Sequence, residues 1–207
     1  MFVIIDYGMG NVKSVQNAFE LLGESVVISD DVKIISESDA IILPGVGSFS
    51  DGMKNLQKKN LLSILKQEVI EKKKPYLGIC LGLEFLVEQS TEGGTHSGFG
   101  WINGSVDKIS PNDKSLKIPH MGWNDTKIKE STGIFKDMSD PTFYYLHSYM
   151  LNLPTSQKNI ITSTCNYGDV IIPASIEKDN IFAVQFHPEK SQSTGIKLLK
   201  NFIETIK

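Results

Sequence analysis

Residues 76–82 read Tyr76-Leu77-Gly78-Ile79-Cys80-Leu81-Gly82. The apolar run predicts a buried strand over 76–79, and the spacing of apolar residues beyond it predicts a helix over 81–89. Glycines on both sides of a cysteine are typical of an elbow, the sharp turn that presents a nucleophile at the end of a strand. Cys80 is therefore the candidate nucleophile, with the start of the helix favouring its thiolate and the Leu81 N–H as a candidate oxyanion donor. A structural cysteine in a glycine-flanked turn is the alternative.

Strand and helix signals alternate upstream of this stretch. Short apolar runs predict strands over 2–5, 25–28 and 40–43, and helical spacing predicts helices over 12–22, with Asn11 as N-cap, and 61–70. Downstream, apolar runs predict short strands over 105–109, 142–146, 159–165, 170–176 and 181–186. Helical spacing then predicts a last helix over 195–206. We expect one α/β domain over 1–207, with a mostly parallel central sheet flanked by helices and a β-rich second half.

The composition excludes several classes of protein. Hydrophobic residues make up 40% of the 207 residues, charged residues 22%, and the net charge is −3. The chain is thus too apolar to be disordered, is not basic enough for a nucleic-acid partner, and has no apolar run that predicts a membrane span. The first residues read as a strand rather than a signal peptide, and two cysteines are too few for a disulfide framework. A cytoplasmic protein is expected.

A second reactive group follows the predicted strand 181–186. His187-Pro188-Glu189 places an imidazole at a strand end with a carboxylate two residues later. A thiol nucleophile needs a base, and the base needs an acceptor that orients its other ring nitrogen. Taken alone, these residues would be a histidine in a turn beside an exposed glutamate. Together with the elbow, they favour a Cys80–His187–Glu189 triad.

The loop Pro44-Gly45-Val46-Gly47 ends the third predicted strand. Its glycines allow the backbone to approach a ligand closely, so Val46 or Gly47 could supply a second oxyanion N–H, although an ordinary turn would look the same.

Two other sites are not expected. Gly8, Gly10 and Asp30 partly match a dinucleotide fingerprint, but Lys13 stands where the third glycine is required. The four histidines lack a second ligand at the usual metal spacing, so we expect neither metal nor cofactor.

These motifs together resemble the class I (triad) glutamine amidotransferases. More narrowly, the chain is similar to the branch that works as a glutaminase beside a (β/α)8-barrel cyclase in histidine biosynthesis. The matching stretches span residues 6 to 191, and they are DYGMGN (6–11), LPGVGSF (43–49), GICLG (78–82), IPHMGWN (118–124), YLHSY (145–149) and QFHPEKS (185–191).

The resemblance implies a role for each matching residue. Cys80 would attack the amide of L-glutamine, His187 would protonate the departing ammonia and later activate water, and Glu189 would orient His187. Val46 or Gly47, with Leu81, would bind the oxyanion. The glutamine would be held by Glu88, His147, Ser148 and Tyr149, and the cyclase would meet Asn11, His120, Trp123 and Lys190.

Glu84 departs from the family pattern, which has glutamine four residues after the nucleophile. A carboxylate offers no hydrogen-bond donor unless it is protonated. Glu84 could pair with the ammonium of the substrate, or it could weaken glutamine binding and discourage thiolate formation.

Three functions follow from the resemblance. The leading one is a glutaminase subunit that supplies ammonia for imidazole glycerol phosphate and aminoimidazole carboxamide ribotide formation. A paralogous subunit that supplies ammonia for surface-sugar amidation has the same chemistry and fits Glu84 slightly better. A stand-alone γ-glutamyl hydrolase would not need the IPHMGWN segment.

Overall fold

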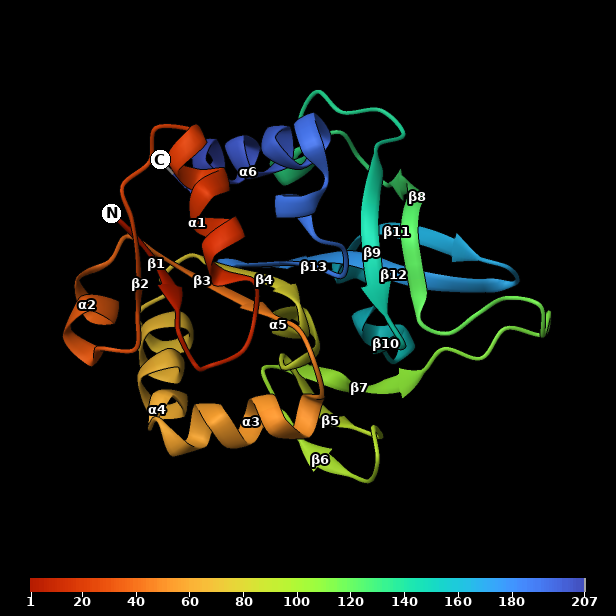
Figure 1. The fold of residues 1–207 in the computed structure, drawn as a ribbon, viewed down its shortest axis with the longest axis horizontal. Helices are drawn as coiled ribbons and strands as arrows, with labels where there is room; N and C mark the ends of the chain where they lie inside the picture. The colour runs from red at the N-terminus through yellow and green to blue at the C-terminus, as the bar shows by residue number, and fades with distance from the viewer. Residues whose placement is uncertain (207) are drawn as a thin grey trace.

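A nine-stranded sheet forms the centre of the computed structural model, which describes residues 1–206 (Figure 1). From β2 through β1, β3 and β4 to β13 its strands pair in parallel, and β12, β11, β8 and β9 continue it antiparallel. The strands are β1 (Phe2–Ile5), β2 (Val26–Ser29), β3 (Ala40–Gly45), β4 (Tyr76–Cys80), β8 (His120–Ile128), β9 (Thr142–His147), β11 (Ile161–Tyr167), β12 (Val170–Lys178) and β13 (Ile181–Val184). The predicted α/β class is confirmed.

Helices cover both faces of the parallel strands (Figure 1). In β1, Phe2 and Ile4 pack in the cluster that holds α1 and α6, whereas Val3 and Ile5 pack with α2, α3 and α4. Burial on both faces explains why these strands are continuous apolar runs. The helices are α1 (Val12–Leu21), α2 (Val32–Glu37), α3 (Phe49–Lys58), α4 (Leu61–Lys66) with its π-helical continuation η1 (Gln67–Glu71), α5 (Leu81–Glu84), α6 (Gln192–Ile206) and the 3-10 turns η2 (Gly133–Phe135), η3 (Thr155–Ile160) and η4 (Pro188–Lys190).

A smaller sheet has the order β10-β7-β5-β6. It shares the hydrophobic cluster of α3 and α4, and only Ser148 separates the end of β9 in the large sheet from the start of β10 in the small one. Residues 146–149 at this crossing line a cavity beside Cys80. The strands are β5 (Val87–Ser90), β6 (His96–Ser97), β7 (Ile102–Lys108) and β10 (Tyr149–Asn152).

The helix predicted over 81–89 is wrong beyond Glu84, because β5 begins at Val87 and pairs with β6 and β7. Tertiary pairing overrides the local helical spacing there. Two helices, α2 and α3, were missed although Asp31 and Ser48 cap them, Ser48 accepting from the Asp51 N–H at 3.2 Å. Asn11 stands at the N-cap of α1, but its side chain accepts from the Ser14 hydroxyl rather than from a backbone N–H.

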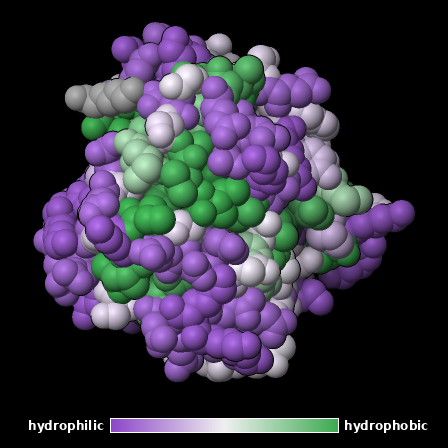
Figure 2. Space-filling view, turned by 60° about the vertical axis from the view of Figure 1, so that its left-hand side comes forward, coloured by the Kyte–Doolittle hydropathy of each residue, from purple (hydrophilic) through white to green (hydrophobic). Residues whose placement is uncertain are grey.

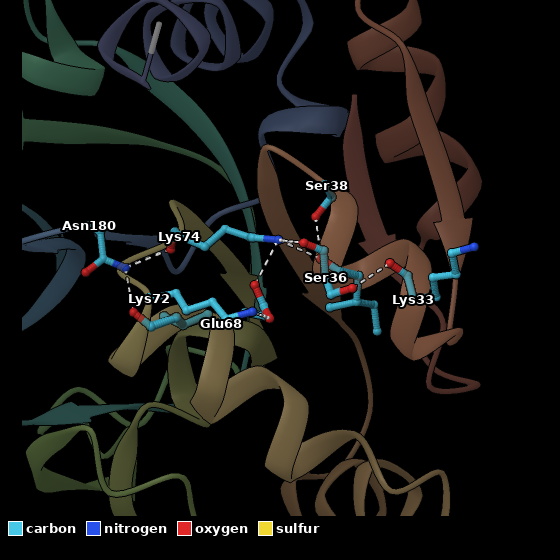
Figure 3. Close-up of polar contacts among 9 residues, drawn as sticks. Lys33, Ser36, Ser38, Glu68, Lys72, Lys74 and Asn180 are labelled. Atoms are coloured by element: carbon cyan, nitrogen blue, oxygen red, sulfur yellow. Dashed lines mark hydrogen bonds and ion pairs between the residues drawn. The ribbon is translucent and has the colours of Figure 1, made fainter.

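A buried ion-pair network joins three separate segments on the side of the sheet that carries α2 and α4 (Figure 3). The Glu68 carboxylate lies 2.7 Å from Lys72 Nζ and 3.0 Å from Lys74 Nζ, and Lys74 also donates to the carbonyls of Ile35 and Ser36. Burial raises the pKa of Glu68, but the hydrogen bonds and charges of the two lysines outweigh it and leave the pKa lowered. The network therefore ties α2 to the segment before β4.

Glu68→Ala is expected to lower the free energy of unfolding by roughly 3 kcal/mol, because it leaves the buried ammonium of Lys74 without its counter-charge. Urea denaturation at pH 7 measures the change. The exposed neighbour Glu71 supplies the control, and Glu71→Ala should shift stability by less than about 0.5 kcal/mol. Equal losses in the two variants would contradict a stabilising role for the network.

Figure 2 turns forward the side on which β2 forms the edge of the large sheet. A hydrophobic area there is bordered by hydrophilic side chains. Exposed apolar residues flank β2 in the sequence, with Leu21 at the end of α1 and Val32 at the start of α2. Within residues 1–206, no helix has both the length and the apolar character needed to cross a membrane.

Candidate active site

Cys80 sits in a strained elbow between β4 and α5. Its backbone angles are φ 54° and ψ −105°, a region that residues other than glycine rarely adopt. Both flanking glycines are required by close approach, since a Cβ at Gly82 would collide with the carbonyl oxygen of Leu43 and one at Gly78 with that of Gly82. The register between β3 and β4 pairs Cys80 with Gly45, which brings the Pro44–Gly47 loop beside the nucleophile.

The thiol of Cys80 is buried and protonated in this state. Its Sγ lies 3.8 Å from the carbonyl oxygen of Leu146, which can accept the S–H, and 4.0 Å from Gln185 Nε2. Burial raises the pKa of Cys80 well above its ordinary value, and the nearby carboxylates of Glu84 and Glu189 raise it further. The expectation that the helix start favours a thiolate is therefore wrong for this state, because α5 has a single turn and desolvation dominates.

His187 and Glu189 form a hydrogen-bonded pair. His187 Nδ1 lies 2.9 Å from Glu189 Oε1, and the 3-10 turn η4 directs the two side chains toward each other. The other ring nitrogen, Nε2, is buried and has no hydrogen-bond partner among the described residues. A histidine that donates from Nδ1 to a carboxylate keeps Nε2 free as a base, so the pair is suited to receive the proton of Cys80.

A cavity of about 230 Å³ opens beside Cys80. Eight of the predicted site residues line it: Val46, Gly47, Cys80, Leu81, Glu84, His147, Ser148 and Tyr149. The lining also includes three residues that were not predicted: Glu92, Pro119 and Leu146. Glycine is needed at Gly47, where φ is 103°, so the loop can place backbone N–H groups at this cavity.

Glu88 is not part of the cavity, contrary to the expectation that it holds glutamine. It lies on β5, is exposed, and accepts from the Gly104 N–H at 3.1 Å. The carboxylate that does face the cavity from this part of the chain is Glu92. The expectation came from the resemblance, whereas β5 presents Glu88 to solvent.

Comparison with known proteins agrees with the site. The class-I glutamine amidotransferase family model matches residues 3–206. This chain belongs to that family. Subunit HisH of imidazole glycerol phosphate synthase from Aquifex aeolicus is 47% identical over 202 residues, which cover 97% of this chain and 94% of that protein. The same subunit from Caldanaerobacter subterraneus is 45% identical over 208 residues, covering 100% and 99%.

Solved structures show the same fold at low sequence identity. The structure of PurLQS from Thermotoga maritima covers 100% of this amidotransferase and 98% of its own chain, with a TM-score of 0.72 and 20% identity. The glutaminase domain of CTPS from Trypanosoma brucei covers 98% and 93%, with a TM-score of 0.66 and 17% identity.

A chain of hydrogen bonds supports the cavity wall of the amidotransferase. His147 Nδ1 donates to the Tyr149 carbonyl at 2.7 Å, so its Nε2 accepts from His120 Nδ1 at 3.0 Å. His120 Nε2 in turn accepts from Asn124 Nδ2 at 3.1 Å. Burial lowers the pKa of His147 to about 3 and that of His120 to about 4, so both rings are neutral at pH 7. No group of three or more His, Cys, Asp or Glu side chains that could hold a metal ion occurs in the described part of the chain, residues 1–206.

The residues predicted to meet a partner divide into two groups. Trp123 is 49% exposed on β8 and packs edge-on against Tyr144, whose ring lies 5.7 Å from Lys190 Nζ. Asn11 precedes α1, which contacts η4 and therefore the segment of Lys190. His120, in contrast, is buried behind this face, because alternate residues of β8 point inward. It supports the face rather than forming its surface.

The ionisation of Glu84 is expected to make stability depend on pH. Burial raises its pKa from 4.5 to about 8. Between these values the folded chain holds a proton that the unfolded chain has released, so the free energy of unfolding falls by about 1.4 kcal/mol per pH unit as pH rises. Glu84→Gln should match the wild type near pH 4.5 and be more stable than it at pH 8 in urea denaturation.

Glu88→Gln is the matched control, since the same chemical change is made at an exposed position. It should follow the wild type at every pH. Parallel pH profiles for the wild type and Glu84→Gln would contradict the raised pKa.

Proposed function

We propose that this amidotransferase hydrolyses L-glutamine to glutamate and ammonia as the glutaminase subunit of imidazole glycerol phosphate synthase, an enzyme of histidine biosynthesis in the cytoplasm. The observation that carries the proposal is a cavity lined by a cysteine elbow, together with a His187–Glu189 pair whose carboxylate acts on the pKa of Cys80, in a chain 47% identical to a HisH subunit over almost its full length.

The first half of the reaction forms a thioester. Cys80 gives its proton to His187 Nε2, and Sγ attacks the side-chain carbonyl carbon of glutamine. The negative charge that develops on the carbonyl oxygen is stabilised by the Leu81 N–H and by an N–H of Val46 or Gly47. His187 then protonates the leaving nitrogen, the C–N bond breaks, and ammonia departs.

The second half releases glutamate. His187, again neutral, removes a proton from water, the hydroxide attacks the thioester carbon, and the C–S bond breaks. The proton returns to Sγ and restores Cys80. Glu189 stabilises the imidazolium in both halves and holds the ring in one tautomer.

The partner is a (β/α)8-barrel cyclase that docks on the face formed by Asn11, Trp123 and Lys190. Support comes from the exposure of Trp123 and of Met121, which is 65% exposed on the same strand. Ammonia would pass to the cyclase at this face without entering bulk water, because ammonium is not a nucleophile.

The test is a reconstitution with the cyclase subunit. Glutamine should replace ammonium salts in the formation of imidazole glycerol phosphate and aminoimidazole carboxamide ribotide, and the gene should restore growth of a bacterium that lacks its own glutaminase subunit on medium without histidine. Product formed only from ammonium would overturn the proposal.

Glu84 favours one second candidate, a paralogous subunit that supplies ammonia to a surface-sugar acceptor. This candidate shares every step at Cys80 and differs only in the barrel partner. Glutaminase activity together with failure to restore growth without histidine would favour it. Full activity without any partner would favour a stand-alone γ-glutamyl hydrolase instead.

A further inference from the structure

Glu84 occupies an unusual position for a carboxyl group. It is the last residue of α5, is 5% exposed, and lines the cavity beside Cys80. Its Oε1 accepts from Gln185 Nε2 at 2.9 Å. Gln185 is fully buried, and its amide nitrogen also lies 4.0 Å from Cys80 Sγ. One amide thus connects the carboxyl to the nucleophile.

Among residues 1–206, no positive charge pairs with Glu84. The groups that act on it electrostatically are Tyr7 from the loop after β1, Cys80 from β4, Glu92 after β5 and Tyr149 from β10, all of which are acids. His147 also lines the cavity, but burial lowers its pKa to about 3, so it is neutral. Within residues 1–206, no lysine or histidine forms an ion pair or hydrogen bond with it. A buried carboxylate with one neutral donor and acidic neighbours keeps its proton at neutral pH.

We propose that Glu84 acts in glutamine binding as a neutral carboxylic acid, whose hydroxyl donates a hydrogen bond to the substrate. Because Oε1 accepts from Gln185, we place the proton on Oε2 of this cavity-lining carboxyl group. A neutral carboxyl group offers both a donor and an acceptor, as a carboxamide does on the same scaffold, although the carboxamide has a second N–H donor. The inference rests on the proposed glutaminase function and adds the protonation state that this function needs.

Ionisation of Glu84 would remove this donor and add a negative charge to the cavity. The charge would repel the carboxylate of glutamine and the thiolate that forms at Cys80. Burial places the pKa of Glu84 at about 8, so both effects begin just above neutral pH. The affinity for glutamine should therefore fall as pH rises above about 8, because of Glu84, a residue outside the triad.

The test separates binding from chemistry. L-Glutamine is titrated calorimetrically into the full chain carrying Cys80→Ser, at pH values from 6.5 to 9, and the same series is repeated with Cys80→Ser/Glu84→Gln. The first protein should lose affinity by up to about 10-fold between pH 8 and pH 9, the limit for release of one proton. The second should show only the change that comes from the amino group of glutamine itself.

The control is Cys80→Ser/Glu88→Gln, which makes the same change at an exposed position outside the cavity. It should keep the alkaline loss of affinity. Affinity that rises with pH, together with a loss of more than 10-fold at pH 7 on Glu84→Gln, would overturn the proposal and show an anion that pairs with the ammonium of glutamine. A profile that Glu84→Gln leaves unchanged would also overturn it.

The proposed function fails in a different way. Its failure is an absence of glutamine hydrolysis by the wild type at every pH, with and without the cyclase, and this inference would fall with it. If the wild type hydrolyses glutamine but Glu84→Gln leaves the pH dependence of glutamine binding unchanged, the inference is overturned and the proposed function stands. If Glu84→Gln does not fold, the glutamine affinity of Cys80→Ser must still fall above pH 8, and a flat profile overturns the proposal.

Discussion

Replacing Cys80 by serine is expected to reduce glutamine hydrolysis by roughly four orders of magnitude or more, the loss seen when a covalent nucleophile is removed from a triad. Cys80 stands at the elbow and lines the cavity, and the Glu189 carboxylate of the His187–Glu189 pair is near enough to raise its pKa. A serine can adopt the same strained backbone at φ 54° with little change in volume, so the fold should persist. Glutamate release by the reconstituted complex measures the loss.

Cys165 provides the matched control for this prediction. It is fully buried in β11, outside the cavity, and burial raises its pKa to about 11. Cys165→Ala should keep the catalytic rate, and a glutamine analogue that carries an electrophile should modify Cys80 and spare Cys165. Activity that survives Cys80→Ser, or labelling at Cys165, would refute the assignment of the nucleophile.

The second large effect is stimulation by the partner. The chain alone should hydrolyse glutamine slowly, and addition of the cyclase with its nucleotide substrate should raise the rate by about 100- to 1000-fold, which is the worth of one oxyanion donor. The peptide around Val46 lies between Gly45 and Gly47, so it can turn its N–H toward Cys80 or away from it. Binding that favours the first orientation increases the active population.

The structure connects this loop to the partner face. A Cβ at Gly10 would lie 2.9 Å from the carbonyl oxygen of Pro44, and a Cβ at Gly47 would lie 2.8 Å from the Met9 methyl carbon, so this segment packs closely against the loop. These residues lead directly into Asn11, at the start of α1. A protein that docks against residues 9–11 and shifts them can therefore shift the Pro44–Gly47 loop, because Gly10 packs against Pro44 and Met9 packs against Gly47.

Trp123→Ala and Lys190→Ala measure the coupling. Each should uncouple glutamine hydrolysis from product formation more than it reduces the reaction of Cys80 with an electrophile. Glu71→Ala, at an exposed position of η1 outside the residues predicted to meet the partner, should leave the stimulation unchanged. Full activity of the single chain, unaltered by any barrel partner, would contradict the prediction.

The sequence predicts the parts of the site that depend on local geometry. The GICLG elbow is recognisable because Gly78 and Gly82 flank Cys80, and His187 and Glu189 are two residues apart on one turn. The parallel strands were also predicted, because burial on both faces leaves a continuous apolar run. In each case the signal occupies a few consecutive residues, although some of the contacts that require it, such as that between Gly82 and the Leu43 carbonyl, are distant in the sequence.

The remaining features depend on pairing between distant segments. β8 was not predicted, since its apolar residues Met121 and Trp123 point outward and interrupt the usual pattern. The position of Glu92 in the cavity, in place of Glu88, follows from the early end of α5 and the pairing of β5 with β6 and β7. Neither event leaves a signal in the local sequence.

The hydrogen bonds of His120, His147 and His187 leave these three histidines with different free nitrogens. His120 and His147 each hold their single proton at Nδ1 and accept at Nε2, so both nitrogens of each ring are already engaged. His187 alone among the three keeps a vacant lone pair. Although the three residues are chemically identical when read along the chain, two of them have both ring nitrogens hydrogen-bonded, whereas the third keeps the free nitrogen that the proposed base requires.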